Sequence, residues 1–171
     1  MDKEKKDPQI QRALDRLISE EWFAGQMYKQ FVLMVNPADR HLICETMVEV
    51  ADDELNDHFK SLVKFAVDNG FDYPANYTEM KRYADKQDVK DFESAKKGQD
   101  AMYYIDKSIA SEQRAIESYQ KLLDNYELAS KYQDFKLVLM NAYYDEQQHL
   151  KDFEFIKSSI ESMDRFGFRP E

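Results

Sequence analysis

Glycine and proline are scarce in this sequence, with four of each among 171 residues. Average usage would supply about 20 in a chain of this length. Sandwiches and barrels of β-strands depend on these residues at their many turns, so the composition excludes an all-β fold. The length itself lies in the usual range of one compact unit, which excludes a multidomain enzyme and predicts a single domain over residues 1–171.

Long apolar runs and cysteine pairs are also missing. The longest fully apolar run covers 31–35, whereas a membrane-spanning helix needs about 20 such residues. The single cysteine, Cys44, allows no intrachain disulfide and no cysteine-based zinc or iron–sulfur site, and we expect it to be a free, buried thiol. No apolar stretch follows the lysines near the start, so we expect a cytoplasmic protein without a membrane partner.

Positively charged residues are outnumbered, because the sequence has 24 lysines and arginines and 34 aspartates and glutamates, which gives a formal net charge of -10. Such a chain repels phosphate backbones and anionic lipid surfaces but attracts cations. The charge balance therefore argues against nucleic acid as a partner.

Helix boundaries can be placed from the few prolines and glycines that are present. Pro8 and Pro37 each follow a good N-cap residue and mark helix starts, while Gly70 supplies a helix stop. These signals predict helices over about 8–35 and 37–69.

Residues 99–166 lack glycine and proline, and their apolar residues recur at intervals of three and four. They predict two further helices, which we separate at the polar stretch 125–133. Antiparallel neighbours need only about 2 to 8 connecting residues, so the long link at about 71–98, with a short helix near 77–84, predicts a crossover. The expected fold is all-α: a four-helix bundle over about 8–166, with two antiparallel hairpins joined by a long crossover.

The first and third long helices share a pattern of glutamate and tyrosine. Glu21 is followed seven residues later by Tyr28, and Glu112 is followed at the same distance by Tyr119. Each glutamate interrupts an apolar stripe, and each tyrosine lies two turns further along that stripe. The pattern is common in one helix alone, but its repetition indicates two equivalent halves.

The second and fourth long helices each carry a glutamate beside a histidine on an apolar stripe. Glu146 and His149 are three residues apart, whereas Glu54 and His58 are four apart. Both spacings make the two side chains neighbours on a helix. The extra residue leaves Asp57, three after Glu54, as an alternative to His58, and a π-bulge would restore the register.

Hairpin register provides an independent check on these glutamates. Glu21 and Glu54 are equidistant from position 37.5, and Glu112 and Glu146 from position 129, both inside the predicted breaks. Four buried carboxylates at one level repel one another unless cations or protons compensate them. Because the stripes carry no lysine or arginine, metal is the better source of positive charge, and mixed carboxylate and imidazole ligands suit a pair of iron or manganese ions.

With these motifs, the sequence over about 12–160 resembles the ferritin-like di-iron carboxylate superfamily, which includes ferritins, bacterioferritins, Dps-like miniferritins and rubrerythrins. The resemblance implies that Glu54 and Glu146 bridge two metal ions and that Tyr28 and Tyr119 hydrogen-bond to ligands and donate electrons. The implied metal ligands are Glu21, Glu54, His58, Glu112, Glu146 and His149.

The resemblance also implies a function. The expected protein binds two iron ions, oxidises Fe(II) with dioxygen or hydrogen peroxide, and serves iron storage and protection against oxidative stress. Bacterioferritins hold haem with a methionine beside the bridging glutamate, and Leu55 occupies that position here, so we expect no haem. Two alternatives stay open: a non-storing di-metal oxidoreductase, such as a rubrerythrin-like peroxide reductase, and a metal-free helical interaction protein.

Residues off the four stripes have plainer interpretations. Acidic side chains such as Glu20 and Asp53 are expected on solvated faces. Adjacent aromatic pairs such as Trp22–Phe23 and Tyr143–Tyr144 cannot all face one core, because neighbouring helical residues point about 100° apart. Some of these rings must lie at the surface, which predicts a homo-oligomer.

Overall fold

The computed structural model describes residues 6–167, and all the regular secondary structure in that range is helical. The helical segments, in chain order, are α1 (Pro8–Met34), α2 (Arg40–Asp52), the π-helix η1 (Asp53–His58), α3 (Phe59–Asp68), α4 (Tyr77–Tyr83), α5 (Lys86–Glu93), α6 (Ala101–Asp124), α7 (Tyr126–Ala129) and α8 (Gln133–Phe166).

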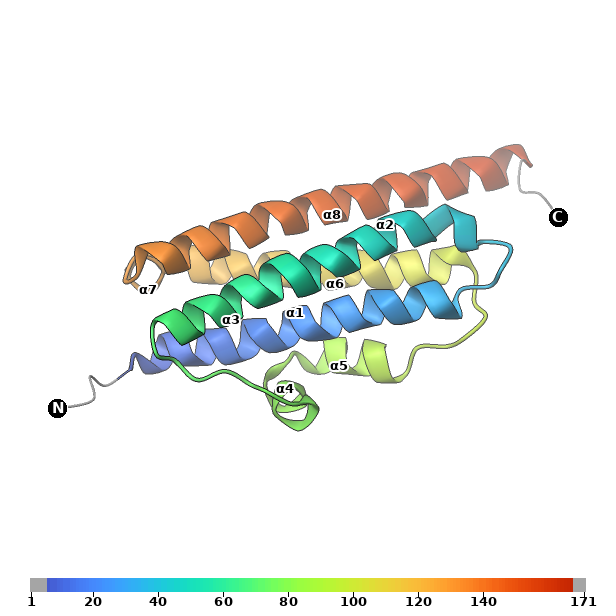
Figure 1. The fold of residues 1–171 in the computed structure, drawn as a ribbon. Helices are drawn as coiled ribbons and strands as arrows, with labels where there is room; N and C mark the ends of the chain where they lie inside the picture. The colour runs from blue at the N-terminus through green and yellow to red at the C-terminus, as the bar shows by residue number, and fades with distance from the viewer. Residues whose placement is uncertain (1–5, 168–171) are drawn as a thin grey trace.

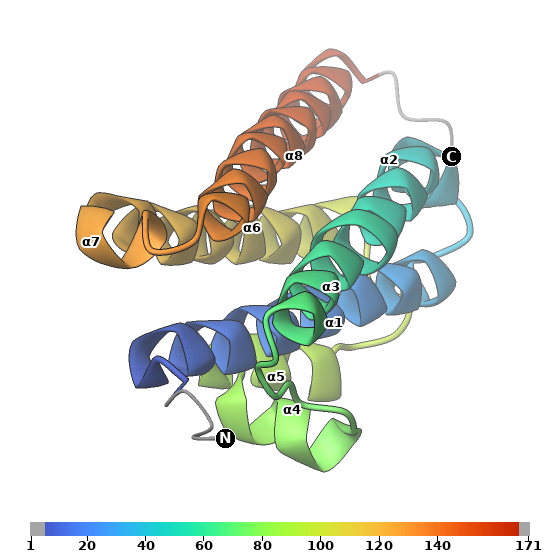
Figure 2. The ribbon, with the colours of Figure 1, turned by 60° about the vertical axis from the view of Figure 1, so that its left-hand side comes forward.

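Two antiparallel hairpins build the four-helix bundle (Figures 1 and 2). In the first, α1 pairs with the continuous helix formed by α2, η1 and α3; in the second, α6 pairs with α8 after the single turn of α7. The crossover brings the chain back along the bundle, and its helices α4 and α5 lie on the side of α1 away from α8. The predicted all-α fold is confirmed. Among the described helices, none is both long and apolar enough to cross a membrane.

The first long helix begins at the predicted cap, whereas the second begins later than predicted. Asp7 caps α1 through its side chain, and Pro8 occupies the first turn, as predicted. The second helix begins at Arg40, so the predicted start at Pro37 is wrong. The Asn36 side chain accepts a hydrogen bond from the amide of Ala38 at 2.8 Å, and this local bond closes a turn before the helix begins.

The crossover is more helical than the sequence indicates. The short helix predicted near 77–84 is present as α4, but α5 was not predicted. This helix is fastened to both hairpins: Arg114 of α6 donates to Asp88 and Asp91 of α5, and the rings of Phe23 and Phe92 lie 5.5 Å apart. The crossover therefore acts as a cover over α1 and α6.

Two apolar clusters fill the two halves of the bundle. One includes Leu14, Phe65 and Phe135, and the other includes Phe31 and Phe153. The buried glutamates and histidines of the long helices lie between these two clusters. Burial of this apolar surface is what holds four helices around a polar centre.

Two sequence expectations about single residues change in the structure. Cys44 is a free cysteine, as expected, but it is half-buried rather than buried. Trp22 and Phe23 contact each other and Tyr77 of α4, so α4 covers this aromatic pair within the same chain.

Candidate metal centre

The structure brings together the six residues that the sequence singles out. One glutamate comes from each long helix, and the two histidines come from η1 and α8. All six side chains are buried, with at most 4% of their surface exposed. They form two groups able to hold a metal ion, each with its ligand atoms within 4.8 Å of one another: Glu21, Glu54, His58 and Glu146, and Glu54, Glu112, Glu146 and His149.

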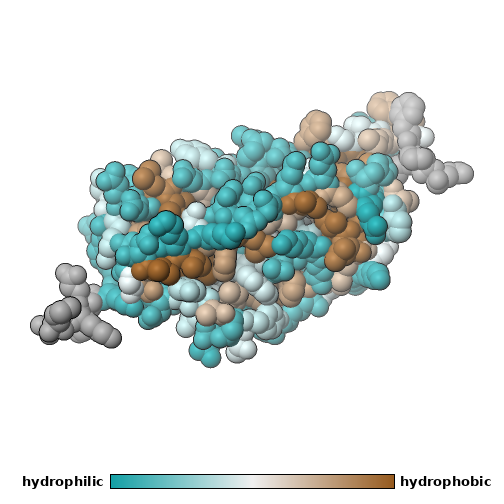
Figure 3. Space-filling model, in the orientation of Figure 1, coloured by the Kyte–Doolittle hydropathy of each residue, from teal (hydrophilic) through white to brown (hydrophobic). Residues whose placement is uncertain are grey.

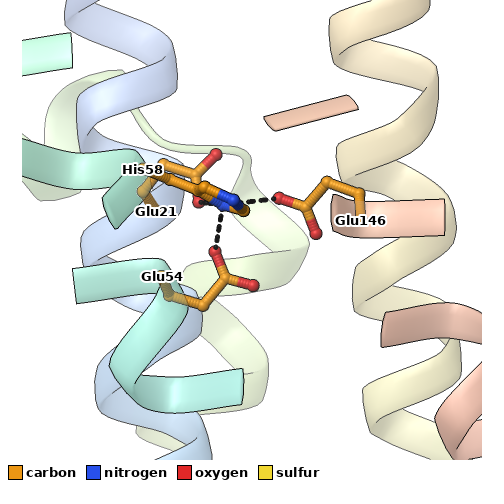
Figure 4. Close-up of side chains that lie close together, drawn as sticks. All are labelled: Glu21, Glu54, His58 and Glu146. Carbon is orange, nitrogen blue, oxygen red and sulfur yellow. Dashed lines mark hydrogen bonds and ion pairs between the residues drawn. The ribbon is translucent and has the colours of Figure 1, made fainter. Parts of the chain in front are cut away.

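The first group is arranged around the Nδ1 atom of His58 (Figure 4). This nitrogen lies 3.3 Å from Glu54 Oε2, 3.3 Å from Glu146 Oε1 and 3.4 Å from Glu21 Oε2. Three carboxylates from three helices thus meet one imidazole.

The second group repeats this arrangement around the Nδ1 atom of His149. The distances are 3.5 Å to Glu54 Oε1, 3.6 Å to Glu112 Oε2 and 3.6 Å to Glu146 Oε2. Glu54 and Glu146 therefore belong to both groups, each with one oxygen toward each histidine. The two imidazole rings lie 5.9 Å apart, with the shared carboxylates reaching both.

The one-residue difference between the halves is absorbed by the π-helix. The amide of Phe59 bonds to the carbonyl of Glu54, five residues back, and this wider turn brings His58 onto the same side as Glu54. Asp57, the alternative ligand, is exposed and belongs to neither group. The same turn brings Leu55 against Gly25 of α1, where an added Cβ would lie only 2.4 Å from Leu55 Cγ.

Tyrosines from the opposite hairpin hold two of the glutamates. The Tyr28 hydroxyl donates to Glu112 Oε1, and the Tyr119 hydroxyl donates to Glu21 Oε1. Both rings are completely buried. Each bond occupies the oxygen that faces away from the histidine and leaves the other oxygen directed into the centre.

Two aspartates that sequence reasoning missed orient the histidines. Asp145 Oδ2 lies 3.2 Å from His58 Nε2, and Asp53 Oδ2 lies 3.2 Å from His149 Nε2. Asp53, expected on a solvated face, keeps 45% of its side chain exposed and in addition contacts His149. The signal was present in the chain, because each aspartate directly precedes a shared glutamate. A carboxylate on the far nitrogen fixes an imidazole with its near nitrogen free to bind a metal.

The four glutamates divide into two electrostatic classes. Burial, reinforced by the charge of Glu146, raises the pKa of Glu21 and Glu112 well above the usual range. Burial also opposes ionisation of Glu54 and Glu146, but close polar contacts with neighbouring glutamates and both histidines lower the pKa values of these two residues below the usual range. Burial therefore favours the protonated form of the outer pair, and the contacts of the shared pair favour its ionised form.

The histidines carry the compensating charge. Burial disfavours the imidazolium, but hydrogen bonds to Asp145 and three glutamates raise the pKa of His58 well above its usual value. Close contacts of Nδ1 with three glutamates do the same for the pKa of His149. With this assignment, two imidazolium ions balance the two ionised glutamates, and the six-residue centre carries no net charge without metal.

Several polar atoms of this centre have no hydrogen-bond partner. Among the described residues, the unpartnered buried side-chain atoms include Glu112 Oε2, both oxygens of Glu146 and His149 Nδ1. Each such atom costs about 1–3 kcal/mol when nothing satisfies it. Because these atoms are the ones that converge, the donor set fits metal ions, with oxygen and imidazole ligands of the kind that iron and manganese accept.

Four long helices in two hairpins with a crossover, enclosing a buried cluster of glutamate and histidine, define a ferritin-like fold. In structure the chain is similar to the bacterioferritin-related protein of Bacteroides fragilis, described as a dodecameric thioferritin. The TM-score is 0.74 at 19% sequence identity, over 92% of this chain and 89% of that protein. No protein-family model matches the sequence, and no curated protein matches it either.

Proposed function

We propose that this protein binds two Fe(II) ions at the buried centre and oxidises them with dioxygen or hydrogen peroxide. The observation that carries the proposal is the pair of overlapping ligand groups that share Glu54 and Glu146. Two cations placed there would each meet one imidazole and three carboxylates, and the shared glutamates would bridge them. Iron held in this way can pass electrons to a small oxidant.

The electron balance explains why two adjacent ions are useful. Each Fe(II) gives up one electron, and dioxygen takes two electrons and two protons to form hydrogen peroxide. Hydrogen peroxide takes two more electrons and two more protons to form two molecules of water. A site with two ions therefore reduces either oxidant by a whole two-electron step.

The surrounding residues have the task of positioning in this proposal. Tyr28 and Tyr119 hold Glu112 and Glu21, each by one oxygen. As buried phenols next to the ligands, they are also the side chains best placed to supply an electron. Asp53 and Asp145 hold the histidines with Nδ1 toward the metal.

Storage of the ferric product would require an assembly that encloses a cavity. Apolar residues reach the surface in several places, with Leu33 74% exposed, Phe155 73% and Tyr144 59%, and the face in Figure 3 shows apolar patches among polar ones. Exposed apolar surface of this kind marks contacts between proteins. We propose a homo-oligomer, as in the dodecameric protein of similar fold.

Oxidation of Fe(II) by the purified protein tests the proposal. Fe(II) is added to the metal-free protein in air, and formation of Fe(III) is followed by absorbance. We expect the protein to accelerate oxidation over buffer, Glu146→Ala to lose the acceleration, and Glu154→Ala, an exposed glutamate on the same helix, to retain it. Equal rates with and without the protein would contradict the proposal.

Iron retained after desalting then separates storage from turnover without storage. Many iron ions per chain, together with a native mass of many subunits, would indicate a mineral inside a cage. A value near two would favour a peroxide-reducing oxidoreductase that needs a separate electron donor.

A further inference from the structure

A small cavity of about 10 Å³ lies beside the centre. Residues of α1, α5 and α6 line it together with ligands of the centre. Small side chains, Ala24, Ser111 and Ala115, form part of its wall. The space is sufficient for about one water molecule or one small ion. The other lining residues are Glu20, Glu21, Glu54, Asp88, Glu112, Tyr119 and Glu146.

Exposure along the cavity falls toward the centre. Glu20 of α1 and Asp88 of α5 each keep 8% of their surface exposed and Ser111 keeps 5%, whereas Glu112 keeps 1% and Glu146 none. The cavity thus has an outer end at Glu20 and Asp88 and an inner end at the ligand carboxylates. The unpartnered Glu112 Oε2 and the two unpartnered oxygens of Glu146 belong to residues that line this inner end.

The two outer carboxylates are each held by an arginine through one oxygen. Arg16 donates to Glu20 Oε1 at 2.6 Å, and Arg114 donates to Asp88 Oδ1 at 2.9 and 2.6 Å. No donor from residues 6–167 bonds to Glu20 Oε2 or Asp88 Oδ2. Burial of Glu20, which the sequence led us to expect on a solvated face, follows from the cover that α5 provides.

A second recess approaches the centre from the opposite side, between α3 and α8, but it ends differently. Its volume is larger, about 370 Å³, and it reaches His58 and Asp145. None of the four glutamates lines it. A cation arriving there would meet the far side of an imidazole that is already bonded to Asp145, rather than a ligand oxygen.

We propose that Glu20 and Asp88 form the access site through which divalent cations reach the centre between α1 and α6. The proposal rests on the proposed function. Adjacent positions on a helix point about 100° apart, so Glu20 receives a cation at the outer end and Glu21, the next residue, receives it inside. Carboxylates lining a narrow, low-dielectric passage concentrate cations and speed their arrival.

Binding of Co(II), followed by its visible absorption in a stopped-flow instrument, tests this without requiring oxidation. The isosteric variants Glu20→Gln and Asp88→Asn should slow binding, by about tenfold in the double variant, and leave the final signal unchanged. Arg16→Gln should speed binding, because it removes a positive charge beside the passage. A purely structural disturbance would not move these variants in opposite directions. Asp57→Asn, at the rim of the other recess, is the matched control and should bind at the wild-type rate.

Three outcomes would overturn the access site. Unchanged rates in Glu20→Gln and Asp88→Asn would show that cations take another path, and slowing by Asp57→Asn alone would place that path between α3 and α8. A smaller final signal in Glu20→Gln would make Glu20 part of the binding centre itself. Failure of the proposed function is distinguishable, because that function is measured as Fe(II) oxidation by the wild-type protein, whereas the access site is measured as the rate of Co(II) binding.

Discussion

Metal binding should release four protons for each pair of divalent ions. Without metal, the raised pKa values of Glu21 and Glu112 favour their protonated forms, and the raised pKa values of His58 and His149 favour charged imidazoles. Ligation requires ionised carboxylates and neutral imidazoles, so each of these four groups loses one proton. Two divalent cations then replace four protons, and the centre stays neutral.

Calorimetric titration of the metal-free protein with Co(II) measures this number. The titration is repeated at pH 7 in buffers of different ionisation enthalpy, since the slope of the observed enthalpy against that enthalpy is the number of protons released. We expect about four protons for two ions. Glu146→Ala, which removes a shared ligand, serves as the control for protons released elsewhere.

The same count fixes the pH dependence and its sign. Protons compete with the metal at all four groups, so lowering the pH by one unit should weaken binding by about 100-fold per ion. Release of two protons or fewer, or an affinity independent of pH between 6 and 7, would refute the charge assignment. The shared glutamates contribute nothing to the count because they are already ionised.

Two other perturbations test the packing around the centre. Gly25→Ala should lower the free energy of unfolding by about 1–2 kcal/mol, because the steric clash of the new Cβ with Leu55 outweighs the gain in helix propensity. In a Leu55→Ala background the clash is absent, and the same change should raise the free energy of unfolding by about 1 kcal/mol. Denaturant unfolding measures both, and destabilisation in both backgrounds would contradict the contact. Asp53→Asn and Asp145→Asn should each weaken metal binding by about 10–100-fold in chelator competition without altering the free energy of unfolding. Unchanged metal affinity would show that the two aspartates do not orient the histidines.

Periodicity within the sequence was sufficient to predict the bundle and the centre. Glutamate is costly on an apolar stripe, so Glu21 and Glu112 stood out, and the symmetry of each hairpin about its turn predicted that the four glutamates meet. The misfit between Glu54 and His58 was itself informative, because a wider turn would restore the register between the two halves, and the structure has a π-helix there.

Features that depend on contacts between distant segments were missed. Glu20 looks like a surface residue within its own helix, but it is buried where α1 meets α5 and α6. Asp53 lies off the apolar stripe of its helix, and its partner His149 is 96 residues away. The start of α2 at Arg40 depends on a local hydrogen bond of Asn36, which a helix-start pattern does not distinguish from a cap.

The number of metal ions bound per chain tests the central claim most directly. Metal-free protein is equilibrated with excess Co(II) or, without oxygen, Fe(II), then desalted and analysed for metal, together with Glu146→Ala and the exposed control Glu154→Ala. The account predicts two ions per chain in the wild type and the control, and fewer than one in Glu146→Ala. No bound metal in the wild type, or two ions retained by Glu146→Ala, would contradict it.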